Sequence, residues 1–349
     1  MNPAMNTELP KNERKLLSIS IDRLIFQEGS AVRARMIEYA KEWGEIHIIV
    51  ATDASFRETS IAPNVWVYPT RSRMKALYPL QAASLGRFII RRRGITNITC
   101  QDPFLTAFAG TALQKQFKIP LEIQIHTDIS SPNFGYTFPN KVRKALALSY
   151  IPKADTVRVV SEKTRKFLME TLNVPEAKIT LRPIAVDVSA IRNAPVIADL
   201  RTKYPQFKKI VLMASRLTPE KNISRAVRAW PEIAAKVPGA GLVIVGTGPC
   251  ERHLKRLASA AGRGSKDGAP SVVFESWADQ TTLASYYKTA DLFLVTSLFE
   301  GYGMTLVEAL AAECPVVSTD VGVARETGAR IIGWSEADLI HGVTEALGV

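Results

Sequence analysis

The hydrophobic positions in the first half of the chain follow two alternating spacings. Short apolar runs have the pattern of buried strands, and longer segments between them repeat at helical spacing. The strand-like runs are 16–21, 46–51, 65–68, 95–100 and 121–126, and the helix-like segments are 31–43, 106–118 and 141–150. Strands that alternate with helices of about 10–15 residues predict a parallel sheet covered on both faces.

The second half starts the same rhythm again. Its strand-like runs are 210–214, 242–245, 272–274, 292–295 and 316–318, with helix-like segments at 223–235 and 252–261. Residues 189–207 contain two prolines and little periodicity, which favours a linker. We therefore expect an α/β protein with two doubly wound, Rossmann-like domains, 15–188 and 208–349. Ligands would bind at the carboxyl ends of the strands, in a cleft that the two domains face.

The ends of the chain and its apolar content predict a cytoplasmic location. Residues 1–14 are polar, lack the apolar stretch of a secretory signal, and suggest a disordered tail. No run of about 18 apolar residues predicts a membrane-spanning helix. Three widely spaced cysteines suit a reducing compartment better than a disulfide framework.

The net charge of +12 is unevenly distributed. Residues 1–188 hold 27 Lys and Arg against 17 Asp and Glu, whereas residues 189–349 hold 18 against 16. The excess includes clusters at 71–75, 91–93 and 141–144. Such clusters attract polyanions, and an anionic membrane surface is one hypothesis, with a solvated face that has no fixed partner as the alternative. Nucleic acid is disfavoured because aromatic and basic residues do not interleave.

The strongest local signal lies in residues 297–311, SLFEGYGMTLVEALA. A buried strand ends, a loop with Gly301 and Gly303 follows, and a helix is predicted to begin near Met304. Glycines let backbone N–H groups approach a ligand, and a helix N-terminus suits a phosphate. Glu300 would lie in this loop.

Glu308 has two interpretations from the sequence. It would lie in the first turns of the predicted helix, where its carboxylate reaches a ligand hydroxyl. Thr305 and Glu308 also fit a capping box, in which Glu308 only satisfies the helix end. Spacing alone does not separate the two.

Two cations follow the first strand of the second half. Arg216 and Lys221 lie in residues 214–222, ASRLTPEKN, where the chain leaves the carboxyl edge of the sheet. Two cations suit a diphosphate. His126 follows a strand of the first half in the same way, and Gly29 and Ser30 open its first helix.

Several common site patterns are absent from the sequence. No Gly-x-Gly-x-x-Gly follows the first strand, and no Walker-type phosphate loop occurs. The chain also lacks an Asp-x-Asp pair and a clustered Cys/His set that would hold a metal. Fixed cations and a helix terminus would then have to bind a diphosphate.

Taken in order, these motifs resemble glycosyltransferase family 4, the retaining sugar-nucleotide enzymes with the GT-B fold. Glu300 and Glu308 stand as the Glu-x7-Glu element of that family. The segments that also resemble the family are 160–168 (VSEKTRKFL), 214–222, 243–249 (VIVGTGP) and 286–297 (YYKTADLFLVTS).

The resemblance implies roles for individual residues. Arg216 and Lys221 would bind the donor diphosphate, Glu300 the hydroxyls of the transferred sugar, and Glu308 the ribose. His126 would face the donor sugar. The remaining residues implied near the sugar or phosphates are Gly29, Ser30, Gly246, Gly301, Tyr302, Gly303, Met304 and Thr305.

The resemblance also implies the reaction and its partners. The expected function is transfer of a sugar from a nucleotide donor to a glycan or lipid-linked acceptor, in cell-surface polysaccharide or glycoconjugate biosynthesis. No metal or other cofactor is expected. Two alternatives remain at this point: a GT-B-type sugar-nucleotide epimerase, and a protein that binds a nucleotide sugar without transferring it.

Overall fold

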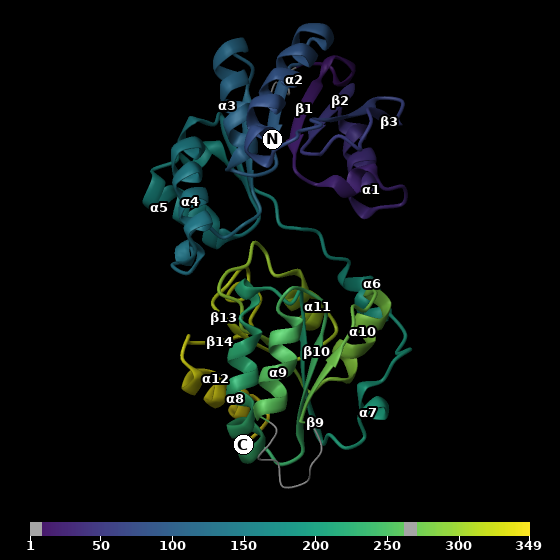
Figure 1. The fold of residues 1–349 in the computed structure, drawn as a ribbon, viewed down its shortest axis with the longest axis vertical. Helices are drawn as coiled ribbons and strands as arrows, with labels where there is room; N and C mark the ends of the chain where they lie inside the picture. The colour runs from purple at the N-terminus through teal and green to yellow at the C-terminus, as the bar shows by residue number, and fades with distance from the viewer. Residues whose placement is uncertain (1–8, 262–270) are drawn as a thin grey trace. The chain divides into compact units, whose positions relative to one another are not determined.

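The computed structural model describes residues 9–261 and 271–349, and Figure 1 shows their fold. The chain divides into two compact units, residues 1–182 and 183–349. Each unit has its own sheet of mainly parallel strands with helices on both faces, which confirms the predicted fold class for each half.

An eight-stranded sheet forms the first unit, in the order β3-β4-β2-β1-β5-β6-β7-β8. Neighbouring strands are parallel except for the antiparallel edge pair of β3 and β4. The strands are β1 (Lys15–Ser20), β2 (Glu45–Val50), β3 (Thr59–Ala62), β4 (Val65–Pro69), β5 (Asn97–Cys100), β6 (Leu121–Ile125), β7 (Thr156–Val159) and β8 (Ile179–Leu181).

The helices of the first unit cover the two faces of this sheet differently. Leu16 points to the face packed by α1 and the turn around Ile25. Gly110 of α3 lies on the other face, so close to the sheet that an added Cβ would be 2.2 Å from Cys100 Sγ. The helices are α1 (Ala31–Tyr39), α2 (Tyr78–Arg93), α3 (Leu105–Phe117), α4 (Phe138–Tyr150) and α5 (Glu162–Leu172).

A six-stranded parallel sheet forms the second unit, in the order β11-β10-β9-β12-β13-β14. Its strands are almost entirely apolar because helices bury both faces. They are β9 (Lys209–Ala214), β10 (Ala240–Val245), β11 (Val272–Glu275), β12 (Leu292–Val295), β13 (Val316–Thr319) and β14 (Arg330–Ile332).

Two cores lie on opposite faces of the second sheet. Trp230 of α8, Leu254 of α9 and Leu339 of α12 share one core with Val211, and α8 and α9 run side by side in Figure 1. The other core receives α6, α7, α10 and α11 against Leu212. The helices are α6 (Val188–Asn193), α7 (Leu200–Lys203), α8 (Ile223–Lys236), α9 (Glu251–Ala261), α10 (Gln280–Thr289), α11 (Met304–Ala311) and α12 (Glu336–Ala346).

The structure differs from the expected domain boundaries at two places. Residues 189–207 are not a linker, because Ile191 (3% exposed), Leu200 (0%) and Phe207 (8%) belong to the core of the second unit. The division falls at 182/183 instead. Of the expected tail, residues 1–8 lie outside the described residues, but Lys11–Glu13 form a 3-10 helix and Gly44 N donates to Arg14 O at 2.9 Å.

Within the described residues, no helix has both the length and the apolar character needed to cross a bilayer.

Candidate active site at the carboxyl edge of the second sheet

The order of strands in the second unit reverses direction beside β9. The chain runs from β9 to β10 and β11 on one side, then returns to β12 on the other side of β9. Ligands of open α/β sheets bind outside the carboxyl ends of strands where the order reverses. The two loops at this point are residues 215–222, after β9, and residues 296–303, after β12.

Two predicted site residues meet across this reversal. Lys221 Nζ lies 2.5 Å from Glu300 Oε1, and the two side chains are only 14% and 16% exposed. Ser297 Oγ donates to the same carboxylate oxygen at 2.7 Å. These loops therefore bring a cation and a carboxylate together, in surroundings that are partly removed from water.

Hydrogen bonds to backbone carbonyls tie the two loops to each other. Leu298 N donates to Glu220 O at 2.7 Å. Thr296 Oγ1 lies 2.9 Å from Lys221 O and 3.1 Å from Asn222 O. These hydrogen bonds join the loop that carries Lys221 to the loop that carries Glu300, so they fix the position of the two residues relative to each other.

Arg216 lies in the same loop as Lys221, but its side chain points into solvent. It is 77% exposed, and its ionic partner among the described residues is Glu220, at 3.6 Å. Thr218 Oγ1 donates to Glu220 Oε1 at 2.6 Å. The structure thus places Arg216 at the predicted strand end, while no described hydrogen bond or ion pair links it to Glu300.

Glycines shape the loop before α11. The helix begins at Met304, as predicted, and its N-cap is Gly303 with φ 92°, a left-handed conformation that side chains rarely adopt. No side chain caps this helix end. Gly322 lies against the loop, where an added Cβ would be 2.2 Å from Tyr302 O. Gly301, Tyr302 and Thr305 lie in this loop and the first turn of the helix.

A second glycine contact joins the loops after β9 and β10. Gly246 has φ 138°, and a Cβ there would lie 1.9 Å from Ser215 O. Leu217 N also donates to Thr247 O at 2.9 Å. Gly246 therefore allows two backbones to touch, which is a structural role beside the ligand contact that the resemblance implies.

The structure contradicts the capping-box interpretation of Glu308. Thr305 is inside the helix rather than at its N-cap. The Glu308 carboxylate instead accepts a hydrogen bond from the Tyr287 hydroxyl at 3.3 Å. Glu308 is 8% exposed, and this burial raises its pKa above the usual range. Glu308 is therefore a buried carboxylate bonded to Tyr287 and not the cap of its helix.

His126 lies at the end of β6 in the first unit, as predicted. Its Nε2 is 3.0 Å from Gln124 Oε1. Burial, assisted by the positive charges of Arg158 and Arg35, lowers the pKa of His126 to about 4. The imidazole is therefore neutral near pH 7.

Gly29 and Ser30 precede α1, as predicted. Gly29 has φ 75°, and an added Cβ would meet no atom within 4 Å. Ser30 is the N-cap of α1: its Oγ accepts from Arg33 N at 3.2 Å and donates to Leu24 O at 2.6 Å. The Ser30 hydroxyl thus both donates and accepts a hydrogen bond within the protein.

Three contributors to the site were not singled out from the sequence. Ser297 donates a hydrogen bond to Glu300. Glu220 forms an ion pair with Arg216. Tyr287 donates a hydrogen bond to Glu308. Ser297 and Glu220 lie within the motifs already recognised, at the same sheet edge. Tyr287 lies within the segment 286–297 that resembles the family, but its contact with Glu308, 21 residues away on another helix, was not predicted.

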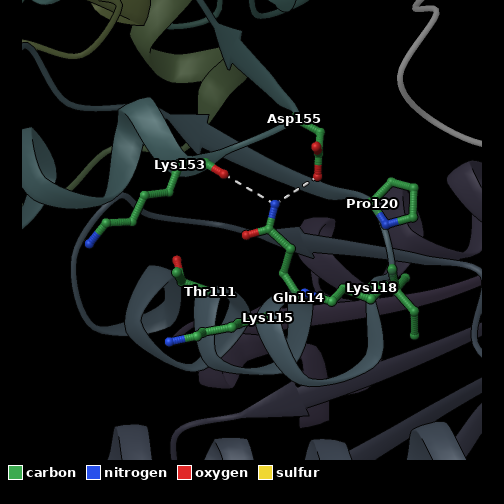
Figure 2. Close-up of a pocket in the computed structure, with 8 residues that line it drawn as sticks. Thr111, Gln114, Lys115, Lys118, Pro120, Lys153 and Asp155 are labelled. Carbon is green, nitrogen blue, oxygen red and sulfur yellow. Dashed lines mark hydrogen bonds between the residues drawn. The ribbon is translucent and has the colours of Figure 1, made fainter.

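The first unit also has a pocket at the opposite end of β6 from His126. It has a volume of about 460 Å³ and lies where α3 ends and β6 begins, so it is at the amino edge of that strand. Figure 2 shows Gln114 donating to Lys153 O and to the Asp155 carboxylate, with Lys115 and Lys118 nearby. No predicted site residue lines this pocket.

Comparisons with known proteins match both halves of the chain. The family model described as Glycosyltransferase Family 4 matches residues 34–190, and the one described as Glycosyl transferases group 1 matches residues 200–329. Sucrose-phosphate synthase from Thermosynechococcus elongatus superposes with a TM-score of 0.75 at 18% identity, covering 96% of this chain and 90% of that one. This similarity shows the fold, which is that of the GT-B proteins.

Two curated relatives add detail. The GDP-mannose-dependent alpha-(1-6)-phosphatidylinositol monomannoside mannosyltransferase of Mycobacterium tuberculosis is 34% identical over 182 residues, which are 50% of this chain and 46% of that protein. The alpha-monoglucosyldiacylglycerol synthase of Streptococcus pneumoniae is 23% identical over 305 residues, 83% of this chain and 67% of that protein. The chain spans about half the length of the first curated relatives it matches. With models of one family matching its two halves in succession, the chain belongs to glycosyltransferase family 4, the group 1 glycosyltransferases.

Proposed function

We propose that this chain is a retaining glycosyltransferase that moves a sugar from a nucleotide-sugar donor to a glycan or lipid-linked acceptor. The observation that carries the proposal is the pair of Lys221 and Glu300, held at the strand-order reversal beside the glycine-capped start of α11. Membership of the family supports the reaction class. Cell-surface polysaccharide or glycoconjugate biosynthesis is the proposed setting.

Each part of the site has a proposed role in transfer. The leaving group of the reaction is a nucleoside diphosphate, so the transition state gains negative charge on phosphate oxygens. Lys221 and Arg216 supply positive charge for that oxygen cluster, and the N-terminus of α11 adds its dipole. Because these fixed charges suit the diphosphate, the proposal includes no metal ion.

The two carboxylates are proposed to orient the donor. Glu300 accepts hydrogen bonds from Lys221 and Ser297 in the structure, so a diphosphate would compete for the ammonium and leave the carboxylate to accept from sugar hydroxyls. Glu308 is proposed to accept from the ribose. Holding the anomeric carbon in one orientation converts binding energy into rate.

A membrane-bound acceptor is the proposed partner of the first unit. Both curated relatives carry names that state lipid substrates or products. On α4, Phe138 (78% exposed), Val142 (45%) and Leu148 (37%) stand in solvent beside Lys141 and Arg143. Exposed apolar residues among cations suit contact with an anionic bilayer surface.

The experiment that tests the function begins with donor binding. Purified chain is screened with UDP-, GDP- and ADP-sugars, and the correct donor is expected to raise the melting temperature, since about 100 Kd of ligand stabilises a protein by about 2.7 kcal/mol. That donor is then incubated with lipid and glycan acceptors, and the anomeric configuration of the product is read by NMR.

Three results would overturn the proposal. Transfer with inversion removes the retaining mechanism. Conversion of the donor to another nucleotide sugar without an acceptor indicates an epimerase. Tight donor binding without turnover on any acceptor indicates a binding protein.

A further inference from the structure

A line of hydrogen-bonded polar side chains runs from His126 into the first sheet. It passes through Gln124 and Glu122 to Thr99. Glu122, Gln124 and His126 alternate along β6 and beyond its end, so their side chains share one face. Thr99 on β5 is the register partner of Glu122. Thr99, Glu122 and Gln124 are 1%, 7% and 3% exposed. Parallel sheets of this kind normally bury apolar residues, so a polar line through the sheet requires a reason.

The hydrogen bonds along this line allow one arrangement of protons. Glu122 Oε1 accepts from Thr99 Oγ1 at 2.9 Å and from Gln124 Nε2 at 3.1 Å. A carboxylate only accepts, so the amide nitrogen of Gln124 has to face Glu122. The single proton of Thr99 is used on Glu122, and Thr99 Oγ1 therefore accepts the other N–H of Gln124, at 3.0 Å.

The orientation of Gln124 then decides the tautomer of His126. With its nitrogen committed, Gln124 presents Oε1 to His126 Nε2 at 3.0 Å, so that ring nitrogen is the donor. Burial lowers the pKa of His126 to about 4, and Arg158 on β7 and Arg35 on α1 add to this effect. A neutral imidazole has one N–H, so Nδ1 carries a lone pair. Nδ1 has no hydrogen-bond partner in the part of the chain that the structure describes.

We infer that Gln124 and Glu122 are positioning residues that fix His126 as the Nε2–H tautomer, so that Nδ1 accepts a hydrogen bond from a hydroxyl group of the substrate. A sugar or polyol hydroxyl is the ligand chemistry that suits a neutral acceptor. The identity of that hydroxyl rests on the proposed function. The tautomer does not, because hydrogen bonds within the first unit alone determine it.

The tautomer is measured directly on the full-length chain without any substrate. In a protein labelled with ¹⁵N-histidine, long-range ¹H–¹⁵N correlation spectra at pH 7 distinguish a protonated Nε2 from a protonated Nδ1, and His126→Gln assigns the signals. We expect His126 as a single Nε2–H species. Observation of the Nδ1–H form, an equal mixture or the imidazolium would overturn the inference, whatever the chain transfers.

Variants separate positioning from general loss of structure. Glu122→Met removes the acceptor that orients Gln124, whose amide can then turn and donate to His126 Nε2, so the Nδ1–H form should appear. Gln124→Met removes the acceptor and should give a mixture. Gln114→Met is the matched control, because Gln114 bonds Lys153 and Asp155 at the other end of β6 and should leave His126 unchanged. An unchanged tautomer in both test variants contradicts the positioning role.

Kinetics test the ligand part separately. Once a donor and an acceptor are known, Glu122→Met, the variant expected to give the Nδ1–H form, should lower kcat/KM roughly tenfold, the value of one ordinary hydrogen bond. Gln114→Met should match the unsubstituted chain. If the tautomer changes as expected while kcat/KM does not, the hydroxyl contact is wrong and the positioning of the imidazole stands. If no transfer occurs at all, the proposed function fails and the spectra still decide the tautomer.

Discussion

Lys221 and Glu300 form a shielded ion pair at the proposed site, so a substitution in the pair affects both folding and the proposed chemistry. Their side chains are each about 85% shielded from water, and the charged atoms are 2.5 Å apart. Such a pair adds little net stability, yet removal of one member leaves the other charge partly buried without its partner. The two effects of a substitution, on folding and on turnover, can therefore be separated by changing one residue or both.

Lys221→Gln should lower both stability and activity. Glu300 would lose its cation, at a cost of about 3 kcal/mol in the free energy of unfolding. The leaving diphosphate would lose a charge contact, which typically lowers kcat by about 100-fold or more. Urea unfolding and initial rates with the identified donor measure the two quantities.

The double variant Lys221→Gln/Glu300→Gln isolates the catalytic part. It removes both charges, so most of the stability should return while the rate stays low. Lys255→Gln, which breaks an exposed pair with Glu251 at 2.7 Å, is the control and should change stability by less than about 1 kcal/mol. A double variant that recovers activity would remove Lys221 from the diphosphate site.

Glu308→Gln tests the second carboxylate. Unlike Lys221→Gln, this substitution is expected to keep or raise stability at pH 7. Burial raises the pKa of Glu308, so the folded chain disfavours the ionised form. Stability from this group is present at low pH and is lost as pH rises through the raised pKa. The glutamine variant cannot ionise, so its melting temperature should equal or exceed that of the parent at pH 7, and the difference should vanish below about pH 4.

The same variant should bind the donor more weakly. Loss of a charged acceptor for a ribose hydroxyl corresponds to roughly a tenfold or greater rise in Kd, measured by calorimetry. If Glu308→Gln instead lowers the melting temperature and leaves Kd unchanged, Glu308 is a packing residue of the Tyr287 contact.

At the scale of elements, the sequence predicted most strands and the helix start at Met304. Apolar runs such as 210–214 and 292–295 lie within fully buried parallel strands, where the hydrophobic pattern is strongest. The sequence also placed Lys221 and Glu300 at the same edge of the sheet, because the carboxyl ends of parallel strands meet at one edge. Short edge strands such as β3 (Thr59–Ala62) and β8 (Ile179–Leu181) gave too little pattern to predict.

Long-range packing explains what the sequence did not predict. Residues 189–207 have weak periodicity because α6 and α7 are too short for a clear helical repeat. Ile191 and Leu200 are nevertheless buried, by partners that lie roughly a hundred residues later in the chain. One of these is Thr289, whose hydroxyl accepts a hydrogen bond from Leu200 N at 3.1 Å. The Gln124–His126 line was missed for a similar reason. The orientation of the Gln124 amide depends on Thr99, which belongs to the neighbouring strand.

Gly246→Ala tests how the loops after β9 and β10 support the site. A Cβ would lie 1.9 Å from Ser215 O, and φ 138° is itself unfavourable for alanine. Because backbone atoms cannot rotate away, the loop carrying Arg216 has to shift. We expect a loss of at least about 2 kcal/mol in unfolding free energy, with weaker donor binding.

Gly328→Ala is the matched control for that variant. Its φ is 83°, so it carries a similar backbone penalty, but no atom lies within 4 Å of the added Cβ. It should cost only about 1 kcal/mol and leave donor affinity unchanged. Equal losses in the two variants would mean that backbone strain alone, rather than contact between the two loops, determines the result.

At the scale of the whole molecule, charge separates the two units. Residues 1–182 hold 27 Lys and Arg against 16 Asp and Glu, whereas residues 183–349 hold 18 against 17. In the first unit, part of this charge lies beside exposed apolar side chains on α4, where Phe138 is 78% exposed. On α9 of the second unit, Leu254 is buried and the cations stand without exposed large apolar neighbours on that helix.

This difference predicts which surface would make the proposed contact with an anionic bilayer. A variant with Lys141, Arg143 and Lys144 all changed to Gln should bind phosphatidylglycerol vesicles roughly a hundredfold more weakly at low salt, since each cation near such a surface contributes about 1 kcal/mol. The control replaces Arg252, Lys255 and Arg256 of α9 and removes the same charge from the second unit. Phe138→Ser should reduce the binding that persists in high salt, because apolar burial is not screened. Co-sedimentation that falls equally in both triple variants would show that net charge alone, rather than the surface of α4, directs the chain to the membrane.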